Sequence, residues 1–129
     1  MSRKKTRTLV AIGGHEDKTD GGAILEQVAR RIGSCKVIVI TVATKEPDDT
    51  FAEYRKALRK FGIKQIAHLK IESRQDAIDE DAASVLDNAK CVFFTGGDQL
   101  RITSLIGDTV VFERINDIYT KGGVIVGTS

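Results

Sequence analysis

Short apolar runs alternate with segments of helical periodicity along the chain. Continuous apolar runs such as Thr8–Ile12 and Val37–Val42 are typical of strands that are buried on both faces, as in parallel sheets. Further strands are predicted over residues 65–71, 92–95 and 124–126. Between the strands, apolar residues recur every three or four positions, which indicates amphipathic helices. The alternation predicts an α/β fold with a doubly wound, mostly parallel sheet and helices on both of its faces.

Glycine, proline and capping residues predict where these helices begin and end. Pro47 with the two aspartates that follow it begins one helix, and Gly62 ends it. Gly107 splits a later segment into two short helices, the second capped by Asp108 or Thr109. The predicted apolar helix faces are Ile24, Leu25, Val28 and Ile32; Phe51, Tyr54, Leu58 and Phe61; and Ile78, Val85, Leu86 and Ala89.

Composition places the chain among ordinary globular proteins. Its 129 residues suffice for one domain, with 41% hydrophobic and 29% charged residues and a formal charge of +2. The near balance of charge argues against a nucleic-acid or membrane partner, and the basic opening MSRKKTR lacks the apolar stretch of a secretory signal. Cys35 and Cys91 each begin an apolar run, so both are expected to be buried, reduced thiols in a cytoplasmic protein.

Three polar segments follow predicted strands: GGHEDK (residues 13–18), TGGDQ (95–99) and GTS (127–129). The carboxyl ends of parallel strands meet at one edge of a sheet, and ligands of such folds bind outside that edge. We therefore expect the three segments to gather there. This edge is the predicted functional site.

Each segment has a functional and a purely structural interpretation. Ser129 on a strand-to-helix elbow, with the small Gly127 two positions before it, fits a nucleophile, although a helix N-cap is the commoner role for such a serine. The glycines of TGGDQ allow backbone N–H groups to approach a developing negative charge; the alternative is a tight turn with Asp98 as N-cap. Diacylglycerol- and NAD-kinase-like proteins also have Gly-Gly-Asp after a strand, but they usually continue with glycine where this chain has Gln99.

The segment GGHEDK contains His15, Glu16, Asp17 and Lys18. Consecutive residues rarely point at one ion, so a polar loop lining a cleft is preferred over a metal site, with Glu16 or Asp17 paired to Lys18. Asp17 and Lys18 are expected to contact substrate, and no metal or cofactor is expected. The second histidine, His68, is predicted to be a packed or edge-strand residue.

Taken together, GGHEDK, FFTGGDQLRITSL and GGVIVGTS resemble, in this order, the cyanophycinase family of serine peptidases (family S51), which also contains aspartyl dipeptidase. The resemblance implies a three-layer fold like that of class I glutamine amidotransferases, which is flavodoxin-like. It also implies that Ser129 is the nucleophile, that the backbone of Gly97 and Asp98 belongs to the oxyanion hole, and that Gln99 contacts the substrate.

The resemblance further implies hydrolysis of cyanophycin, a polyaspartate with arginine on each side chain, to β-Asp-Arg dipeptides. We expect residues 1–129 to be the N-terminal part of a longer, homodimeric peptidase whose sheet is incomplete at the C-terminal side here. The catalytic histidine and its acidic partner would then lie beyond Ser129, and the chain alone would be inactive, with Val124, Ile125 and Val126 partly bare and prone to association. Alternatives are an aspartyl dipeptidase-like enzyme and a non-catalytic binding module on the same fold.

Overall fold

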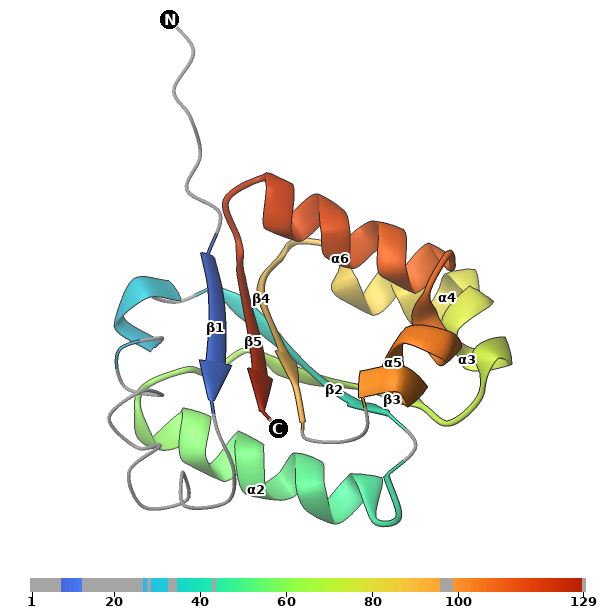
Figure 1. Ribbon diagram of the computed structural model, residues 1–129. Coiled ribbons are helices and arrows are strands. Elements are labelled where there is room, and N and C mark those ends of the chain that lie inside the picture. Colours follow the sequence, from blue (N-terminus) through green and yellow to red (C-terminus); the bar gives the residue numbers. More distant parts are fainter. Residues whose placement is uncertain are drawn as a thin grey trace, which may run out of the picture.

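A parallel sheet forms the middle layer of the protein (Figure 1). The computed structural model describes residues 8–12, 27, 29–32, 35–42, 44–95 and 99–128. The five strands lie in the order β1-β5-β4-β2-β3, and each pair of neighbours is parallel. The strands are β1 (Thr8–Ile12), β2 (Lys36–Val42), β3 (Ile66–Ile71), β4 (Ala89–Phe94) and β5 (Val124–Thr128). The predicted α/β fold class and all five predicted strands are confirmed.

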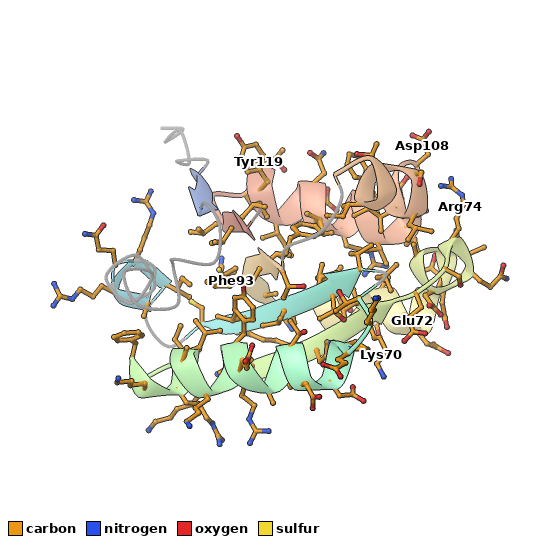
Figure 2. The ribbon with its side chains drawn as sticks, turned by 60° about the horizontal axis from the view of Figure 1, so that its bottom comes forward. Lys70, Glu72, Arg74, Phe93, Asp108 and Tyr119 are labelled. Carbon is orange, nitrogen blue, oxygen red and sulfur yellow. The ribbon has the colours of Figure 1, made fainter. Side chains whose placement is uncertain are left out.

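Helices cover both faces of the sheet and complete the three layers (Figure 1). One face packs on α2 (Pro47–Lys60) and on a helical segment at residues 29–32, around a core that includes Leu58 and Phe93. Figure 2 shows Phe93 between the sheet and α2. The other face packs on α3 (Arg74–Ile78), α4 (Glu80–Ala83), the 3-10 helix η2 (Ser84–Leu86), α5 (Gln99–Ile106) and α6 (Val110–Thr120).

Local signals account for both ends of α2 (Pro47–Lys60) and for the start of α6 (Val110–Thr120). Pro47 begins α2, because its fixed φ suits a first helical turn and its missing N–H would have no helical partner there. Gly62, at φ 95°, follows the end of α2 in a conformation that favours glycine. Thr109, rather than Asp108, caps α6, since its hydroxyl accepts a hydrogen bond from the backbone N–H of Phe112.

The prediction of one helix through Ile78, Val85, Leu86 and Ala89 is wrong. The chain forms α3, α4 and η2 in succession, and Ala89 already belongs to β4. Asp79 causes the first break: its backbone is extended, and its side chain accepts the N–H of Asp81 as the N-cap of α4. A capping aspartate between two helical turns favours a new helix start over continuation. As a result, Ile78 is 47% exposed and lies outside the core.

The expectation that Val124, Ile125 and Val126 are partly bare is also wrong. All three side chains are at most 9% exposed. The strand order explains their burial, because β5 lies between β1 and β4 instead of at an edge. Its side chains alternate between the two core clusters, one on each face of the sheet. Exposure of this strand therefore gives no reason for the chain to associate.

The two cysteines differ in their surroundings. Cys91 is buried in β4, and burial raises the pKa of its thiol far above the ordinary range. Cys35 is only half-buried, so its predicted full burial is wrong. Both are free thiols. Within the described ranges no helix has the length and apolar character that a bilayer crossing requires.

Candidate active site

Three strand ends lie side by side at the edge where the candidate segments begin. Gly127 in β5 pairs with Ala11 in β1 on one side and with Phe94 in β4 on the other. Each segment's key residues start two positions beyond this row: the first Gly-Gly pair after β1, the second after β4, and Ser129 after β5. The sheet thus brings together the starting points of the three segments predicted to form the site, with the serine's strand in the middle.

Most of the predicted site residues themselves lie outside the described residues. They are His15, Glu16, Asp17, Lys18, Gly97, Asp98 and Ser129. Of Gln99 only the backbone is described, as the first residue of α5. Their assigned roles, and the expected pairing of Glu16 or Asp17 with Lys18, therefore remain predictions. The described residues fix the strand ends from which these segments depart.

Gly127 leaves open space at the end of β5. A Cβ atom built on it would meet no atom of the described residues within 4 Å. Gly123, directly before the same strand, differs: a Cβ there would lie 2.5 Å from Cγ2 and 2.7 Å from the carbonyl oxygen of Ile118. Packing of the described residues therefore requires glycine at position 123 but not at position 127. A small residue two positions before a nucleophile is what a strand-to-helix elbow demands.

Thr95 anchors the end of β4 to β2. Its backbone N–H donates to the carbonyl oxygen of Ile40 at 3.1 Å, and its hydroxyl group donates to the same oxygen at 3.4 Å. The side chain is buried. Thr95 directly precedes Gly96 in the sequence. This double contact therefore fixes the point from which the predicted oxyanion segment leaves the sheet.

The helix that follows the second Gly-Gly segment supplies favourable electrostatics. The N-terminal end of a helix such as α5, which begins at Gln99, carries the positive end of the helix dipole. Backbone N–H groups at a helix start are free to donate, because they have no intrahelical acceptor. A developing oxyanion would be stabilised there.

His68 lies too far from the end of β5 to act as a base there. It sits in β3, the edge strand, and β2 and β4 separate β3 from β5. Three strand spacings amount to roughly 14 Å, well beyond hydrogen-bond reach. The prediction that His68 is a packed or edge-strand residue is confirmed.

The contacts of His68 were not predicted from the sequence. Its Nε2 lies 2.8 Å from the hydroxyl oxygen of Thr41, and its ring stacks on Phe51 with centroids 4.5 Å apart. Its Nδ1 lies 4.0 Å from a carboxylate oxygen of Asp48, which also forms an ion pair with Lys70 at 3.1 Å. Figure 2 shows Lys70 beside the first turn of α2. A signal for this cluster existed in the sequence, because Thr41 is the one polar residue in the buried run VIVITV.

Burial lowers the pKa of His68 below its ordinary value of 6.5, and Lys70 acts in the same direction, while Asp48 opposes the shift. The neutral imidazole is therefore favoured in the folded protein. No group of three or more potential metal-ligating side chains gathers in the part of the chain that the structure describes.

Comparison with known proteins shows the family to which the chain belongs. Residues 9–129 match the family described as Peptidase family S51. Cyanophycinases are similar over nearly the whole chain: that of Synechococcus elongatus is 32% identical over 94% of this chain, and that of Trichormus variabilis is 35% identical over 97%. The chain spans 38% and 43%, respectively, of the lengths of these relatives. For the cyanophycinase of Geminocystis herdmanii the identity is 31%, over 98% of this chain and 47% of that protein.

Two solved structures share the fold. A peptidase from an acI-B1 Actinobacterium superposes with a TM-score of 0.72 at 18% identity, over 98% of this chain and 55% of the other. A putative peptidase E protein from Listeria monocytogenes gives a TM-score of 0.68, also at 18% identity, over 95% of this chain and 58% of the other. The sequence match over residues 9–129, together with this shared fold, establishes that the chain belongs to peptidase family S51.

Proposed function

We propose that this chain forms part of a serine-type peptidase that hydrolyses cyanophycin to β-Asp-Arg dipeptides. The single observation that carries the proposal is the row in which Gly127 pairs with both Ala11 and Phe94. It supports a site in which Ser129 leaves the sheet between the two Gly-Gly segments. The sequence similarity to cyanophycinases supports the choice of substrate.

In this mechanism Ser129 attacks the carbonyl carbon of the scissile bond, and its hydroxyl proton passes to a general base. The backbone N–H groups of Gly97 and Asp98 stabilise the oxyanion that forms. Their position directly before α5 supports this role, because the helix dipole favours negative charge there. Gln99 can both donate and accept hydrogen bonds with the peptide groups of the substrate.

The base and its acidic partner are proposed to come from a part of the relatives that this chain does not match. The relatives are more than twice as long as the matched region, which leaves ample sequence for these groups. His68 is unsuitable, since two strands separate β3 from β5. Asp17 and Lys18, after β1, are proposed to contact the charged groups of the substrate.

A substrate panel tests the proposal and separates it from its alternatives. The chain, extended by the remaining length of its relatives, is incubated with cyanophycin and, separately, with short α-aspartyl dipeptides. We expect release of β-Asp-Arg from the polymer, measured by mass spectrometry. Cleavage of the α-aspartyl dipeptides alone would instead favour an aspartyl dipeptidase. Binding of cyanophycin without any cleavage would favour a non-catalytic module.

A further inference from the structure

Thr41 and Thr95 act on one and the same peptide unit. Thr95 donates two hydrogen bonds to the carbonyl oxygen of Ile40, and that carbonyl belongs to the peptide bond whose nitrogen is that of Thr41. Where the side chain of Thr41 is held contributes to the orientation of this peptide unit, beside the pairing of β2 with β3 and β4. That orientation decides whether Thr95 keeps its acceptor.

His68 holds the side chain of Thr41. Thr41 is 1% exposed, and within the described ranges Nε2 of His68 is the one hydrogen-bond partner of its hydroxyl group. The imidazole is itself held on a second side, because Phe51 stacks on it with an angle of 4° between the ring planes. A buried hydroxyl that depends on one partner loses that hydrogen bond entirely when the partner is removed.

We propose that His68 is a positioning residue for the end of β4, acting through Thr41 and the Ile40–Thr41 peptide unit on Thr95. The path has three steps. The imidazole of His68 contacts the hydroxyl group of Thr41, Thr41 is joined to Ile40 by a peptide bond, and the carbonyl oxygen of Ile40 accepts the hydrogen bonds of Thr95. It connects the edge strand β3 with the end of β4, two strands away. A consequence for turnover rests on the proposed function; the structural coupling does not.

Amide hydrogen exchange measured by NMR on this chain tests the coupling directly. In His68→Leu, the amide of Thr95 should exchange about tenfold faster than in the parent chain, since its acceptor is no longer fixed. The resonances of Gly96 and Gly97 should shift as well. His68→Gln should restore most of the protection, because its side-chain amide can reach Thr41. Lys70→Met is the matched control, because Lys70 lies in the same strand as His68. This variant removes the ion pair with Asp48 and should leave the exchange rate of the Thr95 amide unchanged.

Thr41→Val keeps the shape of the buried side chain and removes only its hydroxyl group. It should reproduce the faster exchange at Thr95 even if His68→Leu proves too unstable to measure. If Thr95 stays as protected in Thr41→Val, and in any His68→Leu that folds, as in the parent chain, the inference is overturned.

Kinetics of the extended protein give the second readout. His68→Leu should lower kcat on cyanophycin about tenfold with little change in KM, because the end of β4, from which the proposed oxyanion segment departs, is misplaced in the transition state while ground-state binding is kept. An unchanged kcat alongside faster exchange at Thr95 would overturn the catalytic part of the inference. If the parent protein itself fails to cleave cyanophycin, the proposed function fails, and the exchange result alone decides whether His68 positions the end of β4.

Discussion

Phe94 and Gly127 face each other across β4 and β5, so the chain leaves these two parallel strands at the same level of the sheet. In β4 the residues that follow are a threonine and two glycines; in β5 they are a threonine and a serine. A nucleophile and the donors that stabilise its oxyanion must lie within a few ångströms of one carbonyl group. The pairing of Phe94 with Gly127 brings together the strand ends from which the two segments depart, which supports the roles proposed for Ser129, Gly97 and Asp98.

Gly123, directly before β5, and Gly127, within it, should respond to substitution in opposite ways. Gly123→Ala would drive a Cβ into the backbone of Ile118 and Lys90, at 2.7 and 2.9 Å, and should lower the free energy of unfolding by about 1–3 kcal/mol. Gly127→Ala meets open space and should leave that free energy nearly unchanged. In the extended protein, however, Gly127→Ala should reduce kcat by about 10²-fold, because the elbow is displaced.

Urea denaturation of both variants and kinetics of the second decide this prediction. A Gly127→Ala protein that unfolds as readily as Gly123→Ala would mean that the glycine serves the fold. A stable Gly127→Ala protein with full activity would mean that the elbow tolerates a larger residue.

Gln99 should matter for the substrate and not for stability. Its backbone forms the first residue of α5, and its side chain is proposed to contact the substrate. In the extended protein, Gln99→Ala should lower kcat/KM for cyanophycin while the melting temperature stays nearly unchanged. Loss of stability with full specific activity in Gln99→Ala would assign the residue to the fold.

Stability should depend on pH through His68. Burial lowers the pKa of His68 below 6.5 in the folded protein, so the unfolded chain takes up a proton first as the pH falls. The contribution of His68 to stability is therefore complete above pH 6.5 and is lost as the pH drops toward the lowered pKa. The charged groups that face the ring are Asp48 from α2 and Lys70 from β3, while β2 contributes the uncharged Thr41.

Comparing the parent chain with His68→Gln separates the effect of His68 on the pH dependence of stability from the effect of the carboxylates, because both proteins contain the same carboxylates. The difference in unfolding free energy between the two proteins should change between about pH 8 and about pH 5, with the parent losing more on acidification. An equal loss in both proteins would contradict the assignment.

Thr109 should contribute a measurable share of the stability of α6. Its hydroxyl group donates to the carbonyl oxygen of Ile106 and accepts the N–H of Phe112, so it joins the end of α5 to the start of α6. Thr109→Ala should cost about 1–2 kcal/mol of unfolding free energy, and Thr109→Ser should cost much less. Equal losses in the two variants would assign the effect to the methyl group instead of the cap.

Strands and helix starts were predictable because their signals are local. The apolar run before Gly127 predicts a strand, and Pro47 with its aspartates predicts the start of α2. The burial of Val126 could not be predicted, because it depends on β5 lying between β1 and β4, an order that no local pattern encodes. The break at Asp79 was missed because the helical periodicity on either side of it is continuous.

The candidate site was predictable to a similar extent. Glycine pairs and a serine after strands point to one edge of the sheet, and the register brings those strand ends together. The contact of Thr41 with His68 joins residues 27 positions apart in sequence and depends on the parallel register of β2 and β3. A single polar residue in a buried strand was the available sign, but it did not identify the partner.

The role of Ser129 is tested most directly by β-Asp-Arg release from cyanophycin. Three versions of the extended protein are compared: the parent, Ser129→Ala, and Ser84→Ala as a control in η2, which precedes the opposite end of β4. We predict dipeptide release by the parent and by Ser84→Ala, and none by Ser129→Ala or by the 129-residue chain alone, whose His68 is held by Thr41 far from β5. Undiminished release by a folded Ser129→Ala protein would contradict the account.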